Sequence, residues 1–385
     1  MDSDQAKPQT TRQADDQAPN AHAGDSADDR TSDRDALAVV SQSGPTLTFF
    51  DAHTYRREQT LRLPAEPHEA CFDPDRRLLY VVSTYVSGYY HDHRGRARQL
   101  SVVDPDTRRL VDVVDLGPDH APHGLALDRA RNRLYVSVEA TDTEPGGVLI
   151  LDTRTRRRIG RIPTMAPGPH WFAITPDGRL GYATNKEAPY VSVVDLENDR
   201  FAGRVEVPGS EGLDVSPDGR HVYVAAPKGD FRAHLAGEPG PRPGLRVIET
   251  ATGRVVRTLP TEGVVFPVHT TATGAVLAGE LRMAEGPGGA LGTHTDGVLT
   301  VFAPDTLEPV GQVTVGRFPL TITSSPDGTL GFVANVMSST VTVVDLHRLQ
   351  VVTTLGVDHA GEAGAHGLAY LPAAPAGPRP HPPAA

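Results

Sequence analysis

Residues 171–207 decide the fold, and they read WFAITPDGRLGYATNKEAPYVSVVDLENDRFAGRVEV. Four short apolar runs, each about as long as an ordinary strand, lie at residues 171–174, 180–185, 191–195 and 201–207. Pro and Gly at the second and fourth positions of TPDG suit a type I turn that joins two antiparallel strands. The alternation in YVSVVD is the period-two pattern of a half-buried strand. The stretch therefore predicts a four-stranded meander that is too small to bury both of its faces alone.

Copies of this unit follow one another along the chain. The first turn reappears as FDPDRR from Phe72, LDRARN from Leu127, SPDG from Ser216 and from Ser325, and in degenerate form as TATG from Thr271. The third strand ends in an acid in nearly every copy. Four-stranded repeats of 41 to 58 residues favour propeller blades over a solenoid or a sandwich.

The two ends of the repeat region fix the number of blades. The run that begins at Leu37 supplies second, third and fourth strands without a first strand, whereas residues 366–371 supply a lone first strand. Joined together, they make one blade closed by both termini, which removes the exposed sheet edges of an open ring. With six complete copies, the sequence predicts an all-β fold of seven four-stranded antiparallel blades, the first of them closed by the C-terminal strand.

The repeat resembles that of the YVTN family of β-propellers, the YncE-like group, whose motif is similar to PxGLAVSPDGxxLYVTN…VSVVDxxT. The segments most similar to this motif are LGYATN and LGFVAN, which are followed by VSVVDL and VTVVDL. The resemblance runs from about Leu37 to Leu371. It implies the propeller fold but little about chemistry, because propellers host many unrelated functions.

The segments outside the repeats have a different composition. Residues 1–35 carry nine acids, four bases and almost no large apolar side chain, which predicts a disordered acidic tail. Residues 373–385 are rich in Pro and Ala and predict a second disordered tail, so that the propeller spans residues 36–372. No signal peptide or membrane-spanning run is evident. We therefore expect a cytoplasmic protein, exported only if the start codon is misassigned.

Charge and motifs exclude several functions. Of the net charge of −11, the N-terminal tail contributes −5, and the remaining −6 disfavours binding to nucleic acid. No P-loop, GxSxG, HExxH or Rossmann glycine pattern occurs, so the sequence disfavours nucleophilic-serine chemistry and nucleotide chemistry, and we expect no nucleotide cofactor. The single cysteine, Cys71, is interpreted as a buried small apolar residue. Nothing indicates oligomerisation, and we expect a monomer.

Candidate metal-ligating side chains recur at one position of the repeat, the residue just before each innermost strand. In chain order these residues are His68, His123, His170, Glu211, His269, Leu320 and His366. Five of the 16 histidines therefore share one predicted position, and closure of the ring would bring them together at the mouth of the central channel. Neutral imidazole suits divalent transition metals. The five histidines and the one glutamate are the predicted ligands of an Fe, Cu, Zn or Mn ion.

Glu139 and Glu280 end the second strand in two copies, and we expect them to orient the imidazoles as outer partners. The alternative is that histidine recurs because the repeat was copied, or because it lines a wet channel. Long insertions at residues 84–99, 228–244 and 281–297 lie on the mouth face, opposite the short turns.

Two functions remain open from the sequence. One is a metal-binding protein, with or without oxidoreductase, lyase or hydrolase activity, whose ion sits on the propeller axis. The other is a non-enzymatic propeller that binds a protein or a small molecule on its loop-rich mouth.

Overall fold

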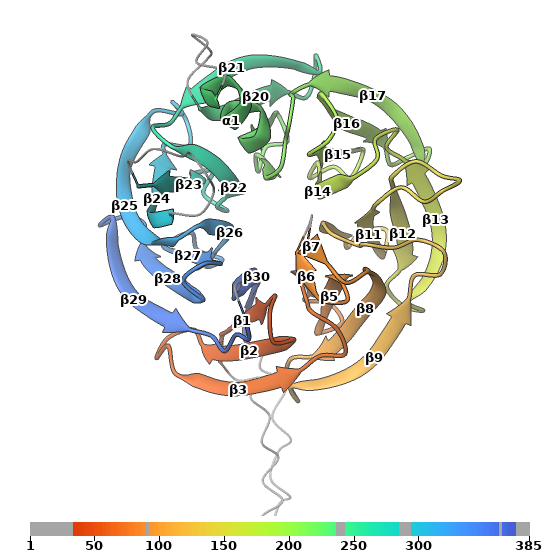
Figure 1. Ribbon diagram of the computed structural model, residues 1–385, viewed down its shortest axis with the longest axis horizontal. Helices are drawn as coiled ribbons and strands as arrows, with labels where there is room; N and C mark the ends of the chain where they lie inside the picture. The colour runs from red at the N-terminus through yellow and green to blue at the C-terminus, as the bar shows by residue number, and fades with distance from the viewer. Residues whose placement is uncertain (1–33, 90–91, 236–242, 285–293, 362–363, 375–385) are drawn as a thin grey trace, which may run out of the picture.

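A computed structural model describes residues 34–89, 92–235, 243–284, 294–361 and 364–374, so the two predicted tails lie almost entirely outside the described residues. Seven four-stranded antiparallel sheets surround one axis (Figure 1). This arrangement confirms the predicted all-β, seven-bladed propeller. In the described part of the chain, no helix is long and apolar enough to cross a lipid bilayer.

Each blade runs from an inner strand at the axis to an outer strand at the rim (Figure 1). The inner strands are β4 (Glu69–Asp73), β10 (Leu125–Asp128), β14 (Pro169–Ile174), β18 (Leu213–Val215), β22 (Val264–Thr270), β26 (Pro319–Ser324) and β30 (Ala365–Leu371). The second strands are β1 (Ala36–Ser41), β5 (Leu78–Tyr85), β11 (Arg133–Val138), β15 (Leu180–Asn185), β19 (His221–Ala225), β23 (Val276–Met283) and β27 (Leu330–Asn335).

The outermost strand of each blade is mostly exposed, whereas the third strand is mostly buried. The third strands are β2 (Thr46–Asp51), β8 (Arg96–Asp104), β12 (Gly147–Asp152), β16 (Tyr190–Asp195), β20 (Gly244–Glu249), β24 (His294–Phe302) and β28 (Thr340–Asp345). The outer strands are β3 (Arg57–Arg62), β9 (Arg109–Asp115), β13 (Arg157–Pro163), β17 (Arg200–Glu206), β21 (Arg254–Pro260), β25 (Pro309–Arg317) and β29 (Gln350–Gly356).

The first blade is closed as predicted, by strands from both ends of the propeller. Its order is β3-β2-β1-β30, and β30 pairs antiparallel with β1 from Ala36 opposite Leu371 onward. This pairing supplies the first blade with its inner strand and joins the two ends of the propeller.

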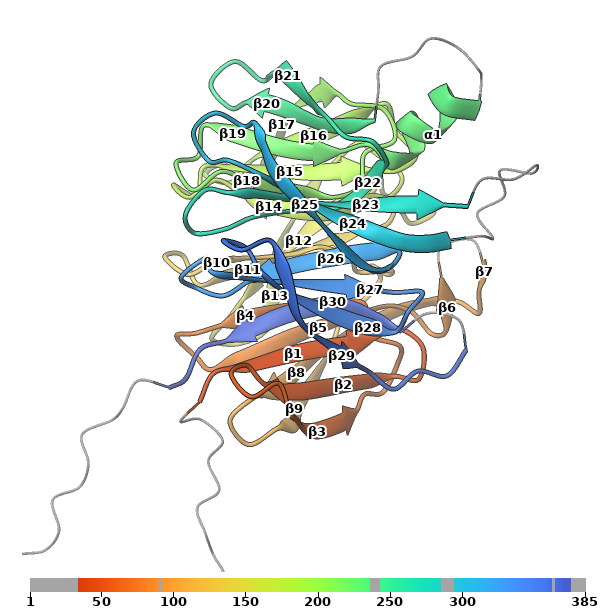
Figure 2. The ribbon, with the colours of Figure 1, turned by 90° about the vertical axis from the view of Figure 1, so that its left-hand side faces the viewer.

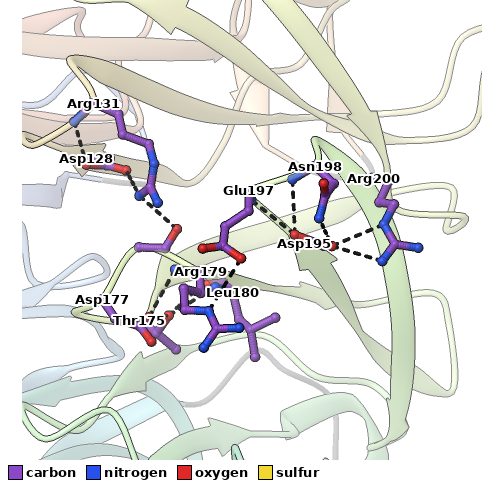
Figure 3. Close-up of polar contacts among 11 residues, drawn as sticks. Asp128, Arg131, Thr175, Asp177, Arg179, Leu180, Asp195, Glu197, Asn198 and Arg200 are labelled. Carbon is purple, nitrogen blue, oxygen red and sulfur yellow. Dashed lines mark hydrogen bonds and ion pairs between the residues drawn. The ribbon is translucent and has the colours of Figure 1, made fainter.

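Short polar turns connect the strands on one face, and their sequences explain the repeated acids. In TPDG, Thr175 Oγ1 donates to Asp177 Oδ1 at 2.6 Å, and Arg179 N donates to the same oxygen at 3.0 Å (Figure 3). At the end of β16, Asp195 Oδ1 accepts from the backbone N–H groups of residues 197 and 198, both at 3.1 Å. An acid at the end of the third strand is therefore needed to cap the turn that follows it.

The core lies between the blades. One cluster combines Tyr182 and Val191 of the blade that contains β14 with Leu213, Val222 and Ile248 of the next blade. Small β-branched and aliphatic side chains fill most of this space, as the low aromatic content predicts. Because neighbouring blades share each core, none of them is expected to be stable alone.

The two faces of the ring differ. The helix α1 (Pro227–Leu235) and the small hairpin of β6 (Gly88–Tyr89) and β7 (Asp92–His93) stand on the face opposite the short polar turns (Figure 2). Both follow second strands, and the inner strands begin on this same face because they run antiparallel to the second strands. The face that carries α1, β6 and β7 is called the mouth face below.

Candidate metal centre

Four of the predicted histidines meet at the propeller axis. Starting from the closed blade, they stand at the beginning of the inner strand in four consecutive blades, in the order His366, His68, His123 and His170. Successive ring centroids are separated by 3.9, 4.0 and 3.4 Å. All four residues are buried, with exposed fractions between 2% and 7%. These four residues are called the axial histidine cluster.

Backbone hydrogen bonds hold the cluster in place. His123 N donates to Ser137 O of its own blade at 2.9 Å, and the carbonyl of His170 accepts from Gly124 N of the preceding blade at 3.0 Å. The carbonyl of His68 accepts in the same way from Gly367 N at 2.9 Å. The backbone around the cluster is therefore tied across two boundaries between blades, by Gly367 to His68 and by Gly124 to His170.

The glycines that follow His123 and His366 permit this close approach. A Cβ on Gly124 would lie 2.5 Å from Phe172 N and 2.7 Å from His170 O, closer than real Cβ contacts. A Cβ on Gly367 would lie 2.6 Å from His68 O. The His-Gly pairs in these two repeats therefore reflect packing between blades at the axis.

Glu69 belongs to the site, although it was not among the residues predicted from the sequence. It directly follows His68, it is 3% exposed, and its Oε1 lies 3.1 Å from His366 Nδ1 and 3.6 Å from His68 Nδ1. In the next and the closing blades, Gly124 and Gly367 occupy the corresponding place after the histidine. An acid at that place was a signal available in the sequence.

Three histidines of the cluster, His68, His123 and His170, are held in their neutral form. Burial lowers the pKa of His68, His123 and His170 well below the usual value, and neighbouring positive charges add to this effect. For Glu69, burial alone would raise the pKa of the carboxyl, but the adjacent His366 and His68 outweigh it and leave the pKa lowered. At neutral pH the site therefore offers imidazole lone pairs beside an ionised carboxylate.

Several atoms of the site that could bind a metal have no hydrogen-bond partner among the described residues. They are Nδ1 of His68, His123 and His366, both ring nitrogens of His170, and Oε1 of Glu69. Glu69 Oε1 and His366 Nδ1 nevertheless lie 3.1 Å apart, which is within the range of an ion pair. Each unpaired buried polar atom costs about 1–3 kcal/mol. A bound cation would offset much of this cost, so these residues fit a metal ion.

The distances fit a metal with modest adjustment. One donor atom from each of His68, Glu69 and His123 lies within 4.8 Å of the other two. Ligands about 2.0–2.2 Å from a shared ion are at most roughly 4.4 Å apart, so the side chains would move by a few tenths of an ångström.

Glu211, the predicted carboxylate ligand, stands in the next blade after His170. It is 7% exposed, and its Oε1 lies 3.2 Å from Lys186 Nζ. The charge of Lys186 also contributes to the lowered pKa of His123 and His170, which places the ammonium group near the cluster. A lysine–glutamate ion pair therefore borders the cluster on this side.

His269 does not join the cluster, contrary to the expectation from the sequence. It is the penultimate residue of β22, whereas the cluster histidines stand at the beginning of their strands. Its Nε2 lies 2.9 Å from Ser324 Oγ, and its Nδ1 lies 3.3 Å from Asp214 Oδ2.

Strand register shows that Phe266 takes the place expected for His269. Val265 pairs with Glu280 in one blade as Pro169 pairs with Asn185 in another, so Phe266 corresponds to His170. The sequence contained the signal: His170 stands five residues before the first residue of TPDG, and Phe266 stands five residues before TATG. The degenerate turn concealed the correct register.

Glu139 and Glu280 are engaged elsewhere, and no hydrogen bond joins either of them to a cluster histidine among the described residues. Glu139 accepts from Arg96 Nε at 2.6 Å and from Tyr85 Oη at 3.3 Å. Glu280 is fully buried between strands of its own blade, where Gly263 N donates to it at 2.7 Å and Thr300 Oγ1 donates to it as well.

Aromatic side chains gather on the other side of the axis from the cluster. Phe266 lies 4.7 Å from Phe318 and 6.2 Å from Phe231 of α1, and His294 lies 5.1 Å from Phe318 (ring centroids). Parts of the three predicted loop insertions, including residues 90–91, 236–242 and 285–293, lie outside the described residues.

Comparisons with known proteins find similarity in the fold of the chain. No protein-family model matches it, and no curated protein matches it. Kuenenia stuttgartiensis hydrazine synthase is 15% identical and has a TM-score of 0.59, with 77% of this chain and 88% of that chain covered. A functionally unknown protein from Desulfotomaculum acetoxidans DSM 771 is 14% identical and has a TM-score of 0.63, with coverage of 87% and 98%.

A third similar structure is the dihydro-heme d1 dehydrogenase NirN in complex with DHE. It is 15% identical and has a TM-score of 0.56, and the match covers 86% of this chain but only 65% of that one. At such identities the likeness shows the fold alone. Fold and site together define a class: a seven-bladed β-propeller with a buried histidine cluster on its axis. These comparisons do not establish membership of the YVTN family.

Proposed function

We propose that this chain is a metal-binding propeller of the YVTN, YncE-like type, in which the axial histidine cluster holds one divalent transition-metal ion. His68, His123, His170 and His366 would supply the imidazole ligands. Glu69 would act as a fifth ligand or would fix the orientation of His366 and His68.

One observation carries this proposal: the axial histidine cluster and Glu69 hold unpaired polar atoms in a buried place, and one ligand atom from each of His68, Glu69 and His123 lies within 4.8 Å of the other two. Histidines retained only as a repeat signature would be expected to bond to backbone or to water. Here both ring nitrogens of His170 lack a hydrogen-bond partner among the described residues, although this residue is only 4% exposed. Neutral imidazole beside a carboxylate is the donor set that divalent ions of the first transition row bind.

The kinds of ligand atom at the site narrow the choice of metal ion. Imidazole suits Fe, Cu, Zn and Ni, whereas all-oxygen sites suit Mg and Ca. Thiolate ligation is not expected, because Cys71, the single cysteine, lies partly buried in β4 outside the cluster and burial raises the pKa of its thiol to about 12. Fe, Cu and Zn are therefore favoured over Mn within the predicted set.

A catalytic role would rest on the same ion. When bound, such an ion acts as a Lewis acid toward water or O₂, which supports hydrolase, lyase or oxidoreductase chemistry. Around it, Glu69 would hold negative charge at the site, and Lys186 with Glu211 would supply a polar border. Two of the structurally similar proteins are named as a synthase and a dehydrogenase, which accords with an enzymatic propeller.

The burial of the cluster favours a second candidate, a binding protein without catalysis. With the four histidines 2–7% exposed, an ion would be well enclosed and a substrate would have little access. In that case the metal would stabilise the ring, and the mouth face would bind a small molecule or a protein. The half-buried aromatic residues Phe231, Phe266 and Phe318 would then contact the ligand.

The experiment that tests metal binding uses metal content and a matched pair of variants. Purified untagged protein is loaded with each ion in turn, desalted and analysed by plasma mass spectrometry. We expect about one equivalent of Fe, Cu or Zn in the wild type and in His269→Ala, and a large loss in a His123→Ala, His170→Ala double variant. Failure of every ion to remain bound to folded wild-type protein would overturn the proposal.

A further inference from the structure

Outside the axial histidine cluster, three inner strands in succession bring together an acid, a histidine and a serine. Asp214 lies in β18, His269 in β22 and Ser324 at the end of β26. His269 Nε2 lies 2.9 Å from Ser324 Oγ, and His269 Nδ1 lies 3.3 Å from Asp214 Oδ2. Serine on one ring nitrogen and a carboxylate on the other is the connectivity of a nucleophile, its general base and the group that orients the base.

Asp214 is itself held firmly. Its Oδ2 accepts from Thr270 N of the next blade at 2.7 Å, and its Oδ1 accepts from Val215 N at 2.7 Å. The carboxylate is thereby directed at His269 Nδ1, which favours the tautomer with a proton on Nδ1. That tautomer leaves Nε2 as the acceptor for the Ser324 hydroxyl.

Ser324 is partly exposed, and its hydroxyl has no competing partner in the described part of the chain. It is half-buried, and among the described residues His269 is the group that its hydroxyl bonds. The side chains of His269 and Asp214 are 22% and 29% exposed, far more than the axial histidine cluster. A small reagent therefore has a route to this site that the cluster does not offer.

Strand β26 also directs the backbone N–H of Ser324 away from its sheet. Ser325 N donates to Leu330 O of the same blade, and N–H groups alternate in direction along an antiparallel ladder. The N–H of Ser324 is therefore directed away from β27, as the N–H of Thr270 is in its own blade, where it reaches Asp214. A nucleophile's own N–H is a suitable donor for an oxyanion.

We propose that Ser324, His269 and Asp214 form a nucleophilic site that cleaves carboxylic esters. Ser324 Oγ forms a bond to the acyl carbon while its proton passes to His269 Nε2, and the alcohol departs with that proton. Water then attacks the acyl-serine, His269 takes its proton and returns one to Ser324 Oγ, and a carboxylic acid is released. The sum is ester plus water to acid plus alcohol, and Asp214 acts as a positioning residue.

This site needs no metal, so its test is separate from that of the proposed metal site. The full chain, treated with EDTA, is incubated with a fluorophosphonate, and the adduct is mapped by peptide mass spectrometry. Ser324 Oγ displaces fluoride from phosphorus, with its proton passing to His269. We expect a stable phosphonyl group on Ser324 at near one equivalent, and turnover of p-nitrophenyl acetate that this labelling abolishes.

Three variants make the outcome decisive. His269→Gln should slow labelling by at least about 100-fold, as expected for loss of a general base. Asp214→Asn should slow it less and should change its pH profile. Ser325→Thr is the matched control, because Thr175 fills the same place in the TPDG turn, and it should label like the wild type. Absence of label on Ser324, or labelling of Ser324 that His269→Gln leaves unchanged, would overturn the proposal.

Discussion

The imidazoles of His123 and His170 lie with their ring centroids 3.4 Å apart, although they belong to different blades. The contact depends on Gly124, whose N–H donates to the carbonyl of His170. Burial of both rings at this distance keeps them neutral, since two adjacent positive charges in a closed site would repel each other strongly. The geometry of this pair therefore sets both the spacing and the charge state of the axial histidine cluster.

Gly124→Ala should separate these two blades at the axis. The added methyl would meet the backbone of β14, and overpacking of this kind costs about 1–3 kcal/mol in the free energy of unfolding. Urea denaturation would measure the loss, together with a weaker response to metal. Gly203→Ala is the control, because a Cβ there has no neighbour within 4 Å. Equal stability of the two variants would contradict the packing described here.

Loss of one cluster histidine should weaken metal binding, whereas loss of His269 should not. His123→Ala removes a buried donor, and we expect the dissociation constant to rise by at least about 100-fold. The raised melting temperature of the metal-loaded protein should disappear in this variant and persist in His269→Ala. Differential scanning calorimetry with and without EDTA would show this, and identical behaviour of both variants would count against the assignment of ligands.

Lys186→Met should tighten metal binding. The ammonium group lies 3.2 Å from Glu211 and lowers the pKa of His123 and His170, so it opposes positive charge at the cluster. Its removal also frees the Glu211 carboxylate to face the ion. We expect an affinity gain of roughly tenfold, since 1.4 kcal/mol of Coulombic relief is reasonable at an effective dielectric constant near 20. Competition titration with a chelator would measure it, and weaker binding would be the opposite of what we predict.

Glu280 should contribute to the stability of the fold but not to metal binding. Its buried carboxylate accepts from Gly263 N and Thr300 and lies 3.2 Å from Arg282. Glu280→Ala leaves these groups without their partner and should lower the free energy of unfolding by about 3 kcal/mol. Metal stoichiometry of the folded variant should stay unchanged. Loss of metal from a stable Glu280→Ala protein would instead support the role expected from the sequence.

The Cys71 thiol should resist alkylation in the native protein. Burial raises its pKa to about 12, and Asp73 adds to the effect, compared with roughly 8.5 in an unfolded chain. Because the folded state favours the neutral thiol, this contribution to stability is complete below about pH 8.5 and declines as the pH rises toward 12. Iodoacetamide at pH 9 should modify the urea-unfolded protein rapidly and the native protein slowly. A Cys71→Ala variant should lack this part of the alkaline loss of stability.

The fold was predictable because its determinants are local and repeated. Turn sequences such as TPDG and the acids that end each third strand have one structural use, and the unmatched strand at each end implied closure by β1 and β30. Four of the five histidines were found in the same way, by their place before an inner strand.

The remainder of the site left weaker signals in the sequence, and the structure was needed to interpret them. The position of His269 depended on register within a blade whose first turn is degenerate, and Phe266 occupies the predicted place. Glu69 stood out in the sequence only as an acid where Gly124 and Gly367 follow the histidine in two other blades, and the structure places its carboxylate beside both His68 and His366. The outer acids Glu139 and Glu280 were expected near the imidazoles by strand position, but their hydrogen bonds lie with other partners.

The most direct test of the central claim is anomalous diffraction from crystals of the protein loaded with Fe, Cu or Zn, recorded on both sides of the metal's absorption edge. We predict a single strong peak on the propeller axis, about 2.0–2.2 Å from nitrogens of His68, His123 and His170. An axis without any peak, in crystals where the metal is present in solution at saturating concentration, would contradict the account.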